Sequence, residues 1–533
     1  PALLVSAALV AVAALLVASL RGEPPSERPT SLAAGGRRVL AILPFANLTG
    51  DPGNTYLGEG LTEDLITRLG RRYSRKLAVI APASVRGYGE NLPPVDEIGR
   101  KLGADYILQG SIRRGAGRLR VTAQLVRARD RTDLWATNYD RPLDDPIEVQ
   151  SEVSKRISEA LALQILDPGD REGLRAAALP AAYDKYLRGR HLLHGHRKGD
   201  AEAALADLQA AVAIDPAFAR GWSSLALALR QQDLPRDEIE PKARAAALKA
   251  LSLDDSDEEA WLTLAMIRFY NDLDPEGAKI AFERAIESQP DYAEAYHHFA
   301  AYWSIRGEHD KAIASVQHAL ALDPLSPAVN ADVGWYFYYA RRYDEAIAAS
   351  KRTLEISPRY VWAHRSLILS CLAKGDDRSA LEAARNEMAQ RGAPADEIAA
   401  VDPDHPGPGL KAYWLWDLRR WDAASVREKA QPAVVGLIYA SLGYRDAALF
   451  TLEKACDARS GWMTPFLRVD PLADPLRSDP RFQSLMKRLD TIASVRASLW
   501  SSAAPPPGGA ARIAAAAKPA GRGASRSRPV VYP

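Results

Sequence analysis

The stretch "YAEAYHHFAAYWSIRGEHDKAIASVQHALALDP", Tyr292 to Pro324, indicates the fold of a large part of this 533-residue chain. Its apolar residues fall at helical spacing on both sides of Gly307, which predicts two helices joined by a short turn. Pro324 lies 34 residues after Pro290 and 34 residues before Pro358. A fixed period of this length predicts an array in which each repeat is one helix pair.

The residues of this stretch resemble the pattern of tetratricopeptide (TPR) repeats, a family whose period is 34 residues. The positions that fit the family's two helices, turn and exit are Tyr296, Phe299, Ala300, Trp303, Gly307, Ala312, Val316, Ala319 and Pro324. The resemblance implies an all-α TPR solenoid whose concave groove holds a protein or peptide.

The repeats are expected over residues 180–392, with weaker TPR-like repeats over 410–498. "DPLADPLRSDPRFQSLMKRL", 470–489, resembles the helix that closes such arrays. Between Pro216 and Pro290 the spacing is 74, two periods plus six, and the extra residues are expected in the loop "RQQDLPRDEIEP". Residues 501–533 carry basic residues and no acid, and we expect a disordered tail.

Residues 37–166 alternate between strand and helix patterns, which predicts an α/β domain with a mixed sheet. Val39–Phe45 is a short apolar run and therefore a buried strand. The following residues repeat leucine every four positions, from Leu57 to Leu69, which predicts a helix that Gly70 ends.

The segment between this strand and helix has the glycines of a phosphate-binding loop, including Gly58-Glu59-Gly60. A P-loop also needs a lysine followed by a hydroxyl residue, whereas Leu61 and Thr62 follow here. A dinucleotide site would need a third glycine where Glu63 stands. Glu59, Glu63 and Asp64 place negative charge in the first turns of the helix, which opposes a bound phosphate. We therefore expect no nucleotide and no other cofactor.

Five motifs in this domain resemble, in order, the TolB-type amino-terminal domain. They are "VLAILPFANLTGDPGNTYLGEGLTEDLITRL", "LAVIAPASV", "EIGRKLGADYILQGSIRR", "RLRVTAQLVRARDRTDLWATNYDR" and "VQSEVSKRISEAL". The resemblance covers the predicted domain, 37–166, and implies a module set between a membrane helix and a repeat array. The family has no catalytic residues in this region, so none is transferred.

Residues 1–21 are predicted to form a single transmembrane anchor, because 2–20 carry no charge and a helix of that length spans about 28 Å. A secretory signal is the alternative, but it needs a basic start. Residues 22–36 are rich in Pro, Gly, Ser and Glu and predict a linker. We expect a bacterial inner-membrane protein that crosses once, with its globular part in the periplasm.

The candidate partner site consists of His297, Trp335, Tyr338 and Arg365, which TPR geometry places on the concave face. Packing against the neighbouring repeat is the alternative for these residues. His191, His194 and His196 lie close together, but solvated histidines at a helix end explain them better than a metal site. Cys371 and Cys456 are expected to be buried thiols.

We find no hydrolase, metalloprotease or kinase signature, and the net charge of +2 gives no general attraction to nucleic acid. The sequence favours a non-enzymatic interaction or sensor protein. It resembles the extracytoplasmic half of a one-component transcriptional regulator, in which a winged-helix domain preceding Pro1 would bind DNA. The alternatives are the regulatory tail of a nucleotide cyclase or serine/threonine kinase and an anchored assembly scaffold.

Overall fold

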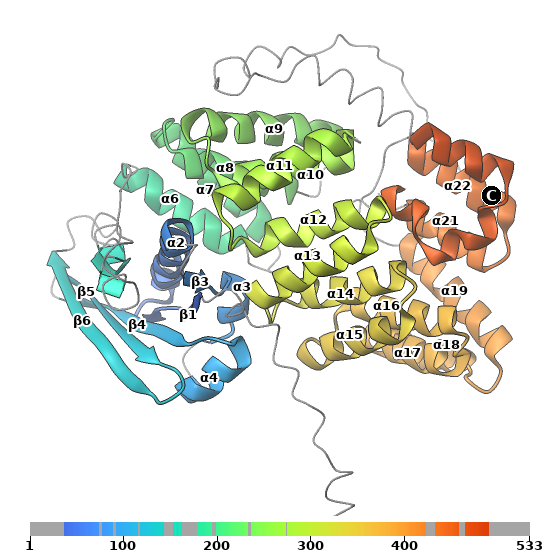
Figure 1. Cartoon of the computed structure of the whole chain (residues 1–533), viewed down its shortest axis with the longest axis horizontal. Coiled ribbons are helices and arrows are strands. Elements are labelled where there is room, and N and C mark those ends of the chain that lie inside the picture. The colour runs from blue at the N-terminus through green and yellow to red at the C-terminus, as the bar shows by residue number, and fades with distance from the viewer. Residues whose placement is uncertain are drawn as a thin grey trace, which may run out of the picture.

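The computed structural model describes most of residues 37–489 (Figure 1). The described ranges are 37–73, 77–88, 92–115, 118–142, 153–154, 156–158, 160–161, 179–193, 199–232, 236–272, 274–422, 432–457 and 464–489. None of the helices within these ranges is long and apolar enough to span a bilayer. The predicted anchor, linker and basic tail all lie outside them.

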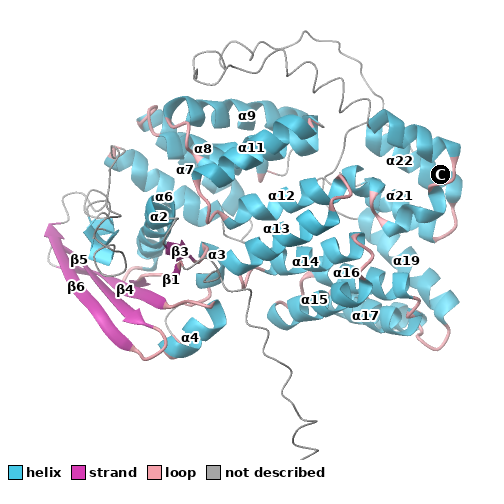
Figure 2. Cartoon of the chain, in the orientation of Figure 1, coloured by secondary structure: helices cyan, strands magenta, loops and turns pink. Residues whose placement is uncertain are grey.

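Six strands form one mixed sheet, which confirms that part of the predicted fold (Figure 2). The strands are β1 Arg38–Ile42, β2 Ala46–Asn47, β3 Leu77–Val79, β4 Tyr106–Gly115, β5 Arg118–Arg127 and β6 Thr132–Pro142. The order is β3-β1-β4-β5-β6, and β2 also pairs with β4. β1 runs parallel to β3 and β4, whereas β4, β5 and β6 are antiparallel.

Helix α2 (Thr55–Tyr73) packs on this sheet through a stripe of fully buried leucines, Leu61, Leu65 and Leu69. The prediction that Gly70 ends the helix is wrong, because α2 continues for three more residues. Its first turn contains no acidic residue, so Glu59 and Glu63 lie further along the helix than predicted. Two shorter helices, α3 (Pro82–Val85) and α4 (Val95–Leu102), complete the α/β domain together with helical residues at 153–154, 156–158 and 160–161.

The array consists of antiparallel helix pairs, as the 34-residue period predicts (Figure 1). The pairs are α6 Pro180–Leu193 with α7 Asp200–Ile214, α8 Ala219–Arg230 with α9 Arg236–Leu253, α10 Glu258–Met266 with α11 Pro275–Ser288, α12 Ala293–Ile305 with α13 His309–Leu322, α14 Pro327–Tyr339 with α15 Tyr343–Ile356, and α16 Val361–Lys374 with α17 Asp377–Gln390.

One hydrogen bond recurs at the start of four of these pairs and fixes the first helix to the turn before it. A nitrogen in the side chain of the first helix lies within bonding distance of the carbonyl oxygen six residues earlier, in the preceding turn. The donor–acceptor pairs are Trp222–Pro216 at 3.0 Å, Trp261–Asp255 at 2.7 Å, Asn330–Pro324 at 3.0 Å and His364–Pro358 at 2.8 Å. The bond aligns the turns of different repeats and shows that Asp255 occupies the proline position of its repeat.

This alignment locates the six residues by which the spacing from Pro216 to Pro290 exceeds two periods. Five of them lie near the predicted loop, and one lies elsewhere. From Pro216 to Asp255 is 39 residues, five more than the period, and from Asp255 to Pro290 is 35, one more. The five extra residues lie in the repeat formed by α8 and α9, which contains the predicted loop. In this repeat α9 is 18 residues long. The sixth produces the π-helical segment η3 (Ile267–Asp272) that continues α10, since one inserted residue widens a helical turn.

The chain after α17 contributes further helices on the far side of the array (Figure 1). They are α18 Ala395–Ala400, α19 Pro406–Asp422, α21 Pro432–Ser441, α22 Arg445–Asp457, the 3₁₀ helices η4 Thr464–Arg468 and η5 Pro471–Leu476, and a helix over 480–489. The predicted closing helix is therefore only half correct, because Pro471 and Pro475 lie in a 3₁₀ helix rather than an α-helix.

Candidate functional site

The glycines of the supposed phosphate loop lie inside α2, where they allow close packing. A Cβ on Gly58 would lie 2.2 Å from the carbonyl oxygen of Phe45, at the end of the strand segment. A Cβ on Gly60 would lie 2.6 Å from a methyl group of Leu187 in α6. Neighbouring chain segments therefore approach the helix closely at both glycines.

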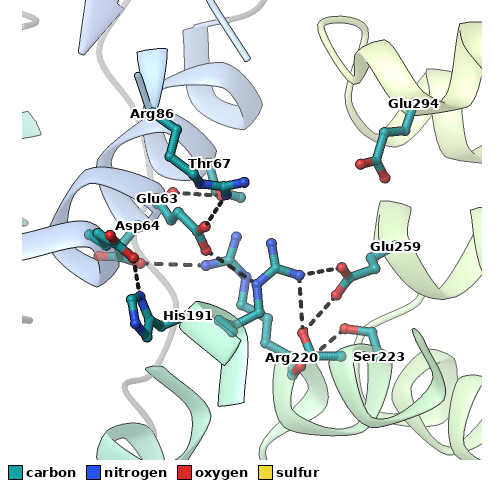
Figure 3. A network of polar contacts seen from close by, with 12 residues as sticks. Glu63, Asp64, Thr67, Arg86, His191, Arg220, Ser223, Glu259 and Glu294 are labelled. Carbon is teal, nitrogen blue, oxygen red and sulfur yellow. Dashed lines mark hydrogen bonds and ion pairs between the residues drawn. The ribbon is translucent and has the colours of Figure 1, made fainter. Parts of the chain in front are cut away.

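The acids of α2 bind arginines of the array instead of opposing a phosphate. Glu63 accepts from Arg86 at 3.3 Å and from Arg190 of α6 at 3.2 Å. Arg190 also pairs with Glu259 at the start of α10 and donates to Ser224 at 3.4 Å. Figure 3 shows Glu63 on the sheet domain and Glu259 on the array, on the two sides of this network.

Asp64 is a second acid that connects the two domains. Its carboxylate is almost fully buried and accepts from Arg68 at 2.5 Å and from Ser154 at 2.5 Å. Arg220 of α8 reaches the same carboxylate at 3.4 Å (Figure 3). A buried carboxylate is stable only when charged or hydrogen-bonding partners surround it, and here one of those partners comes from the array.

A second contact between the domains involves the turns that join successive repeats. Arg37 binds the buried Asp291 at 2.5 Å, and the backbone N–H of Ala81 donates to Leu322 at 3.0 Å. Ser84 of α3 donates to Asp323 at 2.5 Å and accepts from the N–H of Leu325 at 2.9 Å. Together with the α2 contacts, these bonds dock the sheet domain along the turns of the array.

Burial of the two aspartates in these turns makes the interface sensitive to their protonation. Desolvation raises the pKa of Asp291 to about 6, although Arg37 opposes the shift. Desolvation also raises the pKa of Asp323 to about 6, and the hydroxyl of Ser84 only partly offsets it. Both carboxyl groups therefore titrate closer to neutral pH than an exposed aspartate.

Three of the four residues predicted for partner binding are buried. Trp335 and Tyr338 belong to α14 and Arg365 belongs to α16. Arg365 is 4% exposed and donates to the fully buried Asp417 at 2.5 Å. Burial alone would raise the pKa of Asp417, but the positive charge of Arg365 outweighs it and lowers that pKa. In this structure Arg365 therefore joins α16 to α19.

His297, the fourth predicted residue, keeps a small exposed fraction of 14% on its side chain. Its Nε2 lies 2.7 Å from a carboxylate oxygen of Asp332 on α14. Burial would lower the pKa of His297, but the hydrogen bond and charge of Asp332 outweigh it and raise that pKa. This contact ties α12 to α14, the helix that also carries Trp335 and Tyr338.

A segment that follows the helix pairs in sequence packs on the aromatic residues of α14. We call residues 464–476, which contain η4 and η5, the return segment. Phe466 stacks on Tyr339, with ring centroids 5.1 Å apart and planes 24° from parallel. Tyr338 donates to Asp470 at 3.1 Å. We call Trp335, Tyr338 and Tyr339 the aromatic face; the return segment contacts Tyr338 and Tyr339, and Trp335 lies against Trp362 of α16.

Arg341 holds the other end of the return segment and was missed by the sequence reading. Its two terminal nitrogens donate to both carboxylate oxygens of Asp474 at 2.7 and 2.9 Å. Its backbone is left-handed, with φ of 62°, a conformation that disfavours side chains. Gly307 and Gly375 lie 34 residues before and after it and have φ of 76° and 82°. An arginine at a glycine position of the repeat was the signal that could have revealed it.

The two cysteines and His191 lie within the described residues. The described residues contain no group of three His, Cys, Asp or Glu side chains arranged to hold a metal ion. His191 pairs with Glu59 of α2, and its two neighbouring histidines lie outside the described ranges. Cys371 and Cys456 are buried free thiols, as predicted, and desolvation raises their pKa values to about 11 and about 12.

A mixed α/β domain docked on TPR-like helix pairs defines the class of this chain, a protein-interaction fold. No family model matches the chain. The protein named "Putative adenylate cyclase 3" of Rhizobium meliloti is 32% identical over 254 residues, which are 46% of this chain and 42% of that protein. Transcriptional regulator HilA of Salmonella typhimurium is 23% identical over 332 residues, 61% of this chain and 57% of HilA. The chain spans about half the length of these curated relatives.

Solved structures of TPR proteins are also similar to parts of the chain. PilW, a type IV pilus biogenesis factor, is 19% identical and matches 50% of this chain and 98% of its own, with a TM-score of 0.31. A thermophilic TPR protein of Thermus thermophilus is 20% identical and matches 36% of this chain and 100% of its own, also with a TM-score of 0.31.

Proposed function

We propose that this chain is a non-catalytic protein-binding module, and that the aromatic face of α14 is where a partner segment binds. The observation that carries the proposal is Arg341, an arginine in a left-handed conformation at a glycine position of the repeat. Such a backbone costs about 1–2 kcal/mol relative to glycine. The strained residue is retained at the place where its side chain binds an acid of the return segment, Asp474.

The return segment shows which chemistry this face accepts. It offers an aromatic ring at Phe466 and carboxylates four and eight residues later, at Asp470 and Asp474. The ring of Phe466 stacks on Tyr339, and such an aromatic pair stabilises by about 0.5–1.5 kcal/mol beyond the burial of its apolar surface. The carboxylate of Asp470 accepts from the hydroxyl of Tyr338, and that of Asp474 accepts two hydrogen bonds from the guanidinium of Arg341. We therefore expect a partner segment with an aromatic residue followed by acids.

A partner must displace the return segment before it can reach this face. A segment tethered to its own site competes at an effective concentration of about millimolar. A free peptide of similar affinity therefore binds poorly at micromolar concentration until the tethered copy is weakened. On this proposal His297 and Arg365 extend the site from α14 towards α12 and α16.

The test uses a fluorescent peptide with the sequence of residues 464–476 and the whole chain. Asp470→Asn with Asp474→Asn weakens the tethered copy but leaves the aromatic face and Arg341 intact. We expect weak binding to the wild type, at least tenfold tighter binding to this double variant, and loss of that gain when Arg341→Ala is added. Asp446→Asn with Asp457→Asn removes two acids of α22 and serves as the control. Equal binding to the wild type and the double variant would contradict the proposal.

The proposed place of the module is within a longer membrane-anchored signalling protein. Its α/β domain would be of the TolB type, anchored through residues 2–20 with the globular part in the periplasm. Similarity to a transcriptional regulator supports a regulator in which the partner signal crosses the membrane to a DNA-binding domain. Reading the gene upstream of the Pro1 codon tests this, since a winged-helix domain is expected there. Extraction of the whole protein from membranes by carbonate would contradict the anchor.

A second candidate is the regulatory tail of a nucleotide cyclase. The observation that favours it is the 32% identity over 254 residues to the protein named as an adenylate cyclase. In that case the upstream frame encodes a cyclase domain with metal-binding aspartates, and the present chain keeps the same non-catalytic role.

A further inference from the structure

A cleft of about 660 Å³ lies in the α/β domain. It is formed where β1 and β4 begin and β5 ends. In sheets with parallel strands, ligands usually bind beyond the carboxyl ends of the strands. Here the residues that follow β3, including Ala81 and Ser84, bind the array instead. The cleft lies at the opposite end of the sheet, where β1 and β4 begin.

Four arginines line the cleft: Arg38 on β1, Arg100 on α4, and Arg127 and Arg129 at the end of β5. A guanidinium presents its donors in a planar fork that fits a carboxylate or a phosphate. Within the described residues, the guanidinium of Arg38 has no hydrogen-bond or ion-pair partner.

The acids of the cleft are already engaged. Asp105 accepts the backbone N–H of Val39 at 2.9 Å and so holds the start of β4 against β1. Asp96 accepts from Arg131 at 2.7 Å, and this contact and its hydrogen bonds lower its pKa although desolvation opposes the shift. Each of these two acids is therefore already held by a contact within the fold.

The charged residues around the cleft carry more positive than negative charge. Arg127 and Arg129 share one acid, Asp130, at 3.2 and 3.5 Å. The lining of the cleft itself holds four arginines and two acids, Asp96 and Asp105, an excess of two positive charges. A ligand with two negative charges would balance it.

The backbone around the cleft is shaped for close approach. Gly99 of α4 lies so near the turn after β5 that a Cβ on it would meet the Cβ of Ala128 at 2.4 Å. The pairing of β5 with β6 shifts register between Leu125 and Val126, just before the two cleft arginines of this strand. Such irregularities re-aim side chains and are frequent next to binding sites.

We propose that this cleft binds a small molecule with two or more negatively charged groups, either phosphates or carboxylates. The arginines supply the recognition, and the small residues Gly99, Ala104 and Ala128 leave the space. The site is independent of the protein-binding role of α14. It lies next to the interdomain contact, however, because Arg38 directly follows Arg37, which binds Asp291 of the array.

The test is isothermal titration calorimetry of the whole chain at constant ionic strength, with pyrophosphate, citrate and acetate as separate ligands. The cleft variant is Arg38→Ala with Arg129→Ala. The control is Arg113→Ala with Arg114→Ala, which removes two exposed arginines from the other end of β4.

We expect pyrophosphate or citrate to bind the wild type and the control equally, and the cleft variant at least tenfold more weakly, with no saturable binding of acetate. Binding of pyrophosphate alone identifies a phosphate ligand, and binding of citrate alone identifies a carboxylate ligand. Failure of both to saturate, or equal binding to the cleft variant and the wild type, would overturn the proposal. Binding of the 464–476 peptide should not change in the cleft variant.

Discussion

Arg341 and Asp474 lie 133 residues apart in sequence and form a two-pronged ion pair at 2.7 and 2.9 Å. Arg341 makes this contact from a left-handed backbone, where two other repeats have glycine. The pair is about half exposed, 48% for the arginine and 40% for the aspartate, so its net contribution to stability is at most about 1 kcal/mol. Its role is therefore to position the return segment rather than to stabilise the fold.

Replacing Arg341 with glycine separates these two effects. Arg341→Gly relieves about 1 kcal/mol of backbone strain and removes an ion pair of similar size, so the midpoint of urea unfolding should hardly change. Protection of the return segment against hydrogen exchange should nevertheless fall. Arg342→Ala, which breaks an exposed pair with Glu345 on the same turn, is the control and should leave the segment protected. A large loss of stability in Arg341→Gly would show that the pair is structural.

The close approach of α2 to α6 predicts a strong effect of a single methyl group. Gly60→Ala places a Cβ 2.6 Å from Leu187, so α2 and α6 must move apart or Leu187 must leave its rotamer. Overpacking of this kind costs about 1–3 kcal/mol. Thermal unfolding should show a lower midpoint, and protease should cleave between the domains sooner. Gly87→Ala is the control, because a Cβ there meets no atom within 4 Å. Equal midpoints for the two variants would refute the packing argument.

The guanidinium of Arg190 joins two acids from different domains, and its removal should loosen the interface. Arg190→Ala leaves Glu63 and Glu259 mostly buried without this partner, which costs about 3 kcal/mol. Lys185→Ala removes a cation from the same helix, but that pair with Asp207 is more exposed and is worth about 1 kcal/mol at most. The urea midpoint should therefore fall much further in Arg190→Ala. A smaller loss than in the control would contradict the proposed network.

The interface should weaken as pH rises through the pKa of Asp323. Its folded pKa of about 6 lies above the ordinary value of 3.8, so its stabilising effect is complete below about pH 4 and lost as pH rises through 6. The two-unit shift corresponds to about 3 kcal/mol at most. Besides Ser84, the groups that act on it are Glu294, which raises the pKa, and His297 and Arg86, which lower it.

Asp323→Asn imitates the protonated carboxyl and should remove this dependence. From pH 4 to pH 7, the unfolding free energy of the variant should increase relative to that of the wild type. Asp215→Asn changes the aspartate at the equivalent turn of an earlier repeat and is the control. A difference that stays constant with pH in Asp323→Asn would show that the carboxyl does not titrate in this range.

The sequence was sufficient for the elements whose signal is local. The leucines of α2, the apolar run of β1 and the 34-residue period each predicted an element that the structure contains. Ser350 and Thr353 break the TPR pattern, yet both are fully buried, because Ser350 bonds to Ser366 and Thr353 to the carbonyl of Ala349. Polar residues fit this core because each finds a partner, Ser350 in the next repeat and Thr353 within its own helix.

The remaining features depend on residues far apart in sequence, which a single sequence does not pair. Glu63 lies 127 residues from Arg190, and Asp474 lies 133 from Arg341. The acids of α2 were therefore interpreted only as unfavourable for phosphate, although they bind the array. The aromatic face was predicted from repeat geometry, but the segment that covers it lies well over a hundred residues further along the chain.

Hydrogen–deuterium exchange of the whole chain tests the central claim most directly, namely that the return segment occupies the aromatic face and leaves it when a partner segment binds. Exchange is measured by mass spectrometry with and without saturating 464–476 peptide, in the Asp470→Asn, Asp474→Asn variant. We predict faster exchange in residues 464–476 of the chain when the peptide binds, with α14 still protected. Binding of the peptide with no change in residues 464–476 would contradict the account.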